Sequence, residues 1–174
     1  MIPLDILMPI LRGVHVLTGV YWAGAIFLLV EFVEPSLRAS GPAGGAVMRD
    51  MVRRGYLRTI PIVAVLTAVS GLWLYWIVSG HLNSGWGHSP FGTSITVGAA
   101  AALVALVLGW WKLRPIGYRL AGLLDRIASA SSDEEREQLQ AEVGPLRDTF
   151  RKYLRASAVL LLVAVLGMGI ARYL

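Results

Sequence analysis

Four long apolar runs constrain the fold of this chain more than any other feature. They cover about residues 10–33, 60–78, 93–111 and 156–173, and each is close to or longer than the roughly 20 residues that a helix needs to cross a bilayer. Lipid cannot satisfy exposed backbone N–H and C=O groups, so each run is expected to be helical. The four runs leave no room for a second folded domain. The sequence therefore predicts a single all-α integral membrane domain over 1–174, a four-helix bundle.

Basic residues are concentrated in two of the three connections between these runs. Five lie between the first and second runs and nine between the third and fourth, so these connections hold 14 of the 16 lysines and arginines. The connection at 79–92 has none. Because loops rich in Lys and Arg remain in the cytoplasm, both basic connections are predicted to be cytoplasmic and both termini to be outside.

The long connection over 112–155 is predicted to be a helical cytoplasmic segment. Ser132 precedes three acidic residues, which is typical of a helix N-terminus. Gly144-Pro145 is expected to interrupt this helix, and a basic amphipathic stretch over 146–154 leads into the fourth run. We interpret the connection as a solvated hairpin on the lipid headgroups, with a partner-binding surface as the alternative.

Small residues recur at spacings of three and four within the last three runs. Such spacing places them on one side of a helix, where they allow helix backbones to approach closely. The positions are Ala64, Ala68 and Gly71, then Gly98, Ala102, Ala105 and Gly109, and finally Ala164, Gly167 and Ala171.

The composition excludes several classes of function. The chain has no cysteine, so disulfides, thiolate catalysis and thiolate-bound metal clusters are ruled out. Its net charge of +5 is explained by contacts with anionic lipid headgroups, so the expected partner is the lipid bilayer and not nucleic acid. The first run lacks a basic leader and a small-residue cleavage site, and we expect it to be retained.

Ionisable residues within an apolar run are candidates for function because charge is costly there. His15 and Arg12 are three positions apart and share a helix face, which Gly19 and Trp22 continue toward the middle of the run. Gly19 is expected to leave room on this face for a bulky group. Near the other end of the run, Glu31 lies one turn from Glu34 and can extend to the interface.

Two interpretations of this face remain open. In one, His15 forms a hydrogen bond with a neighbouring helix and Arg12 meets headgroups. In the other, His15 donates an imidazole nitrogen to a metal or haem iron, and Arg12 pairs with a propionate. His81 and His88 are predicted to be on the same side of the membrane, where either could supply a second ligand or simply be solvated.

The first two runs resemble a group of small bacterial membrane proteins. The stretch Arg12-Gly-Val-His15-Val, followed by Tyr21-Trp22-Ala-Gly24, is similar to the opening of the HemJ-type protoporphyrinogen oxidases and the CopD-like copper-resistance proteins. The pattern Met51-Val-Arg53-Arg54, Ile60-Pro61, Thr67 and Gly71-Leu72-Trp73-Leu74 resembles the second helix of the HemJ type. The last two runs are similar in hydropathy alone.

The resemblance implies a bundle in the bacterial inner membrane that binds b-type haem or porphyrin, with His15 matching the histidine associated with that site. HemJ-type proteins also carry a lysine early in the third helix, after a His-Ala pair. Residues 91–98 here contain neither lysine nor histidine. The resemblance therefore favours a haem-binding relative, active in electron transfer or another haem-related role, over an oxidase.

Two alternatives come from different classes of function. A copper-handling protein would draw on Met8, His15, Met168 and a loop histidine, because imidazole and thioether ligands suit Cu(I). A structural subunit would use the small-residue faces to join a homo-oligomer or a larger membrane complex.

Overall fold

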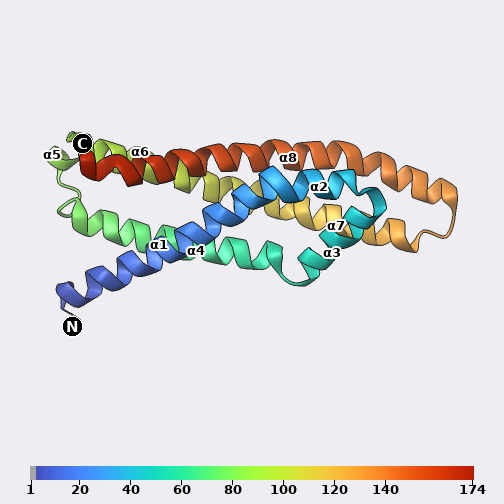
Figure 1. The fold of residues 1–174 in the computed structure, drawn as a ribbon, viewed down its shortest axis with the longest axis horizontal. Coiled ribbons are helices and arrows are strands. Elements are labelled where there is room, and N and C mark those ends of the chain that lie inside the picture. The colour runs from blue at the N-terminus through green and yellow to red at the C-terminus, as the bar shows by residue number, and fades with distance from the viewer. Residues whose placement is uncertain (1–2) are drawn as a thin grey trace.

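The computed structural model describes residues 3–174, in which every regular element is helical. The start of α1 and the C-terminus lie with α5 at one end of an elongated bundle, the terminal end, while α2, α3 and the α7–α8 turn lie at the other, the basic end (Figure 1). In chain order the elements are α1 (Leu4–Leu28), η1 (Leu29–Val33), α2 (Glu34–Ala39), α3 (Gly41–Arg53), α4 (Tyr56–Val78), α5 (Ser84–Gly87), α6 (Pro90–Leu108), η2 (Gly109–Leu113), α7 (Arg114–Ser129), α8 (Asp133–Ile170) and η3 (Ala171–Tyr173).

Four helical stretches are long and apolar enough to cross a membrane, as in a multi-pass membrane protein. They cover Asp5–Ala39, Tyr56–Val78, Pro90–Ser129 and Asp133–Tyr173, and each contains one of the four apolar runs. Large apolar side chains are exposed on the outside of all four, including Leu17, Val69, Val104 and Val159. This is the expected arrangement where the surrounding solvent is lipid.

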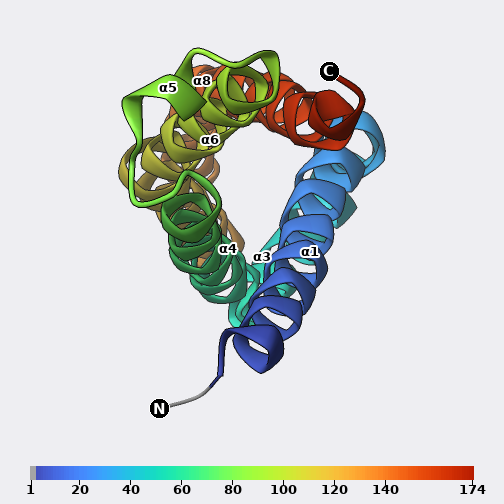
Figure 2. The ribbon, with the colours of Figure 1, turned by 90° about the vertical axis from the view of Figure 1, so that its left-hand side faces the viewer.

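The four long helices form a ring in the order α1, α4, α6, α8 when viewed from the terminal end (Figure 2). Within this ring α6 and α8 approach closely. A Cβ atom added at Gly167 would stand 3.0 Å from the carbonyl oxygen of Ser94 and 3.5 Å from Cα of Gly98. The Ser94 hydroxyl donates to the carbonyl of Gly167 at 2.7 Å. The small residues predicted to pack these helices do so here, because a larger side chain would hold the backbones apart.

Helix α8 is continuous over 38 residues, so the predicted interruption at Gly144-Pro145 is wrong. Proline removes one backbone hydrogen bond and crowds the preceding turn, which is a local cost. The buried side chains of Leu139 and Phe150 lie on either side of the proline and hold both parts of the helix in the bundle. The predicted start is confirmed, since Ser132 Oγ accepts a hydrogen bond from the Glu135 N–H at 3.2 Å.

Two π-helical turns connect apolar helices to their extensions at the basic end. η1 joins α1 to α2 and η2 joins α6 to α7. Each π turn is followed by a proline, Pro35 or Pro115, in the first turn of the next helix. Because a proline ring crowds the turn before it, a widened turn lets each helix continue without a break. Glu34 and Arg114 occupy matching positions, directly after the π turn and before the proline.

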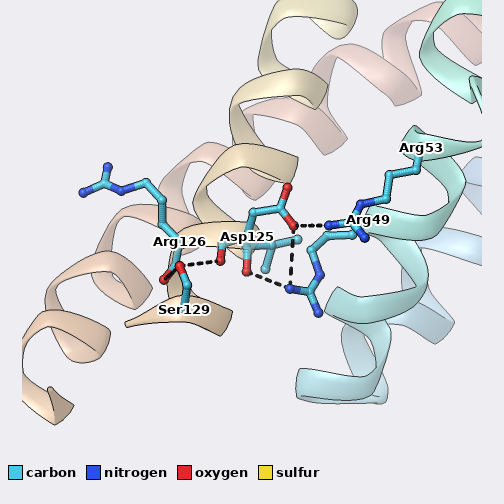
Figure 3. A network of polar contacts seen from close by, with 6 residues as sticks. Arg49, Arg53, Asp125, Arg126 and Ser129 are labelled. Carbon is cyan, nitrogen blue, oxygen red and sulfur yellow. Dashed lines mark hydrogen bonds and ion pairs between the residues drawn. The ribbon is translucent and has the colours of Figure 1, made fainter. Parts of the chain in front are cut away.

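The two basic connections meet at the basic end (Figure 3). Arg49 and Arg53 of α3 lie 3.8 and 3.1 Å from a carboxylate oxygen of Asp125 in α7. Arg49 also donates to the carbonyl oxygen of Leu124 at 3.2 Å. The sequence predicted that both connections lie on one side of the bundle, away from residues 79–92, and the structure confirms this.

Candidate functional site

A cavity of about 240 Å³ lies among the four long helices, on the terminal-end side of Trp22. Most of its wall is apolar, and α4 and α6 supply most of the lining. We call it the His15 cavity, because His15 of α1 and Met168 of α8 are the histidine and methionine side chains that line it. Arg12 also lines it, and the Arg12 side chain is exposed to the exterior.

The imidazole of His15 is fixed by α4. Its Nδ1 lies 2.9 Å from the carbonyl oxygen of Thr67, and a carbonyl can accept but not donate. Nδ1 therefore carries the proton, and in the neutral ring Nε2 keeps its lone pair. Within residues 3–174, no side chain or backbone group forms a hydrogen bond with Nε2. A metal-binding histidine usually has this arrangement, in which one nitrogen donates to a carbonyl and the other is available as a ligand.

Both interpretations of His15 from the sequence are thus compatible with its geometry. One ring nitrogen forms the interhelical hydrogen bond, and the other remains a possible ligand. The two roles complement each other, because the carbonyl partner fixes the tautomer and the ring orientation that a metal requires.

Gly71 is a site residue that the sequence indicated as a packing position and as part of the resembling pattern, but not as part of a site. A Cβ atom at Gly71 would stand 2.6 Å from Cε1 and 2.9 Å from Nδ1 of His15, closer than real Cβ contacts allow. Glycine is therefore required for the ring to lie against α4. The available signal was its spacing, since Gly71 is one turn after Thr67 on the same face of α4.

The remaining residues of the predicted α1 face occupy different surroundings. Trp22 is 5% exposed and lines the cavity, whereas Gly19 is not among the lining residues. A Cβ at Gly19 would contact Thr67 Cγ2 at 3.5 Å, so α4 occupies the space that was expected to take a bulky group. Arg12 forms no ion pair with any residue of the described part of the chain.

The loop histidines lie outside the lining of this cavity. His81 is exposed in a left-handed backbone conformation, with its ring 5.3 Å from that of Trp76. His88 is also exposed and follows α5. Among residues 3–174 no group of three or more His, Asp or Glu side chains could hold a metal ion. Met168, which belongs to the copper set considered from the sequence, lines the cavity and offers a thioether sulfur beside the imidazole of His15.

No protein-family model matches this chain, and no curated protein or solved structure is significantly similar to it.

A second, smaller cavity of about 50 Å³ lies on the basic-end side of Trp22. Trp22 lines both cavities and stands between them. The smaller cavity is lined by Arg114 and Ser157 among mainly apolar side chains. We call it the Arg114 cavity.

Proposed function

We propose that this protein binds b-type haem in the His15 cavity and acts in electron transfer or another haem-related role. The supporting observation is the hydrogen bonding of the two ring nitrogens of His15. Its Nδ1 donates to the Thr67 carbonyl, and its Nε2 has no partner in the described chain, so the residue is arranged as an iron ligand. The hydrogen bond also increases the basicity of Nε2, which strengthens coordination.

The other donors around the cavity suit a haem. Met168 offers a thioether from α8, which lies beside α1 in the ring of helices on the side away from α4 (Figure 2), and we propose that it would be the second ligand to the iron. Arg12, which is exposed and without an ion pair in residues 3–174, would pair with a propionate. The aromatic side chains of Trp22, Tyr75 and Phe91 would pack against the macrocycle.

The cavity volume limits how far a porphyrin can be enclosed. At about 240 Å³ the cavity is smaller than the roughly 300–1,000 Å³ typical of small-molecule pockets. Part of the ring would therefore lie outside it, against lipid. The bound haem would supply one-electron redox chemistry, while the protein would supply the ligands, exclude water and pair Arg12 with one propionate.

The proposed orientation in the bacterial inner membrane follows from charge. With 14 of the 16 basic residues in the connections of the basic end, that end is assigned to the cytoplasm. The terminal end, both termini and the His15 cavity are then on or near the outer side.

A Cu(I) site is the second candidate, favoured by the same pairing of an imidazole with a thioether. Haem brings four nitrogen ligands of its own, so His15 and Met168 would be the only ligands that the protein needs to supply. A protein-built copper site needs further ligands, and no other histidine or methionine is among the residues that line this cavity.

An absorption spectrum of the detergent-purified protein tests the proposal. A Soret band with reduced α and β bands, present on purification or after addition of haemin, is the expected result. A protein that remains colourless after haemin addition but retains Cu(I) against a chelator would overturn the haem assignment in favour of copper.

A further inference from the structure

The Arg114 cavity contains two polar groups that have no partner within the described part of the chain. Ser157 is 2% exposed, and its Oγ is buried without a hydrogen bond. Nε of Arg114 is also buried without a hydrogen bond. Both residues line this same cavity, one from the start of α7 and the other from α8. Two unsatisfied groups at one cavity are unusual, because buried polar groups are nearly always hydrogen-bonded.

Ser157 differs from Thr67 and Ser70, the buried hydroxyl residues of α4. A serine or threonine in a helix commonly donates to the carbonyl one turn earlier. Ser70 and Thr67 do so in α4, with distances of 2.7 and 2.9 Å to the carbonyls of Leu66 and Val63. Ser157 makes no such bond, so its hydroxyl is available to a group in the cavity.

Arg114 carries a charge that the protein does not neutralise locally. Its guanidinium lies over the rings of Trp110 and Tyr118, at 5.1 and 5.8 Å from their centroids, which fixes its position. No carboxylate of the described residues forms an ion pair with it. Glu34, the matching residue after the other π turn, does have an oppositely charged partner, since Arg151 lies 3.9 Å from its carboxylate.

The dimensions and donors of the cavity define the chemistry of its ligand. A guanidinium N–H and a hydroxyl together recognise an anionic oxygen. The cavity of about 50 Å³ exceeds the roughly 10–15 Å³ that a single water needs and is too small for a whole metabolite. We propose that Arg114 and Ser157 bind one oxyanion group, a phosphate or carboxylate, between the helices.

Two sources could supply this group, a lipid headgroup or a free anion. Arg114 lies three residues after the end of the third apolar run, where basic sequence begins. Lipid phosphates lie at this level of a bilayer. Binding is measured by native mass spectrometry of delipidated protein with phosphatidylglycerol, with zwitterionic phosphatidylcholine, or with inorganic phosphate alone.

The variants Arg114→Gln and Ser157→Ala test the two donors, and Arg119→Gln is the matched control. Arg119 is an exposed arginine of the same helix α7 that pairs with Glu142 at 3.5 Å. Arg114→Gln is expected to weaken binding of phosphatidylglycerol about tenfold or more, because a hydrogen bond to a charged group is lost. Ser157→Ala is expected to weaken it less, and Arg119→Gln by less than about twofold.

Thermal stability provides a second measurement. If no oxyanion occupies the cavity, Ser157→Ala should shift the Tm by the same amount with and without phosphatidylglycerol. With an oxyanion bound, the same variant should lose part of the rise in Tm that phosphatidylglycerol gives the wild-type protein. A Tm rise with inorganic phosphate alone identifies a free anion as the source. Equal binding of all three probes by wild-type protein and Arg114→Gln would overturn the proposal, and neither measurement depends on haem.

Discussion

The imidazole of His15 lies against the backbone of Gly71, where a Cβ atom would stand 2.6 Å from Cε1 of the ring. One turn earlier on α4, the carbonyl of Thr67 accepts the Nδ1 proton of the same ring at 2.9 Å. Helix α4 therefore determines both the position and the tautomer of a side chain that α1 carries. The proposed ligand depends on the packing of these two helices.

Gly71→Ala is expected to displace His15 and to reduce the haem content of the purified protein several-fold. Alanine in a helix interior is usually more stable than glycine by about 0.5–1 kcal/mol, so a fall in Tm would report the clash with the ring. Gly13→Ala is the control, because a Cβ there meets nothing within 4 Å. Haem per protein, measured as the pyridine haemochromogen, should fall in Gly71→Ala alone. Equal haem in both variants would show that the ring does not need this position.

Gly167→Ala is expected to destabilise the contact between α6 and α8 by about 1–3 kcal/mol, the usual cost of overpacking. The added Cβ would stand 3.0 Å from the carbonyl of Ser94, while a Cβ at Gly169 of the same helix meets nothing within 4 Å. Thermal unfolding in detergent compares the two variants. A Gly167→Ala protein that is as stable as Gly169→Ala would mean that the helices are further apart than described.

Much of the fold was predictable from the sequence because hydropathy and local capping determine it. The four apolar runs all lie within long helices, and Ser132 begins α8. The continuity of α8 through Pro145 was not predictable, because it depends on packing of Leu139 and Phe150 against the rest of the bundle. Local rules describe only the cost of the proline.

The candidate site was predictable in part. Helical spacing placed Arg12, His15 and Trp22 on one face, and all three line the same cavity. Gly71 and Met168 come from α4 and α8, and their proximity to α1 depends on which helices are neighbours in the ring. Spacing along one helix carries no information about that order.

The proposed orientation is tested with single cysteines, since the chain contains none. The two variants are Tyr173→Cys, near the C-terminus, and Ser131→Cys, in the turn between α7 and α8 at the basic end. A membrane-impermeant maleimide is expected to label Tyr173→Cys in intact cells and Ser131→Cys only after permeabilisation. The reverse pattern would place the His15 cavity on the cytoplasmic side.

We expect that the protein does not rescue a bacterial strain lacking protoporphyrinogen oxidase. Residues 91–98 lack the lysine that HemJ-type proteins carry in the corresponding region. Growth without added haem is the measurement, with a HemJ-type protein in the same vector as positive control. Rescue at ordinary expression levels would show that this lysine is not needed for the activity.

The haem content of His15→Ala tests the central proposal most directly. Loss of the iron–nitrogen bond should remove most of the haem, because packing cannot replace a coordinate bond. His81→Ala and His88→Ala should retain it, since neither residue lines the cavity. Met168→Leu should retain haem but shift a low-spin spectrum toward high-spin.

Adding imidazole distinguishes the loss of the iron ligand from a failure of His15→Ala to fold, because imidazole can enter the space left by the side chain. We predict that purified His15→Ala lacks the Soret band and regains it with haemin and imidazole together. A His15→Ala protein that keeps its full haem complement with an unchanged spectrum would contradict the account, and His15 would then be an interhelical hydrogen-bonding residue alone.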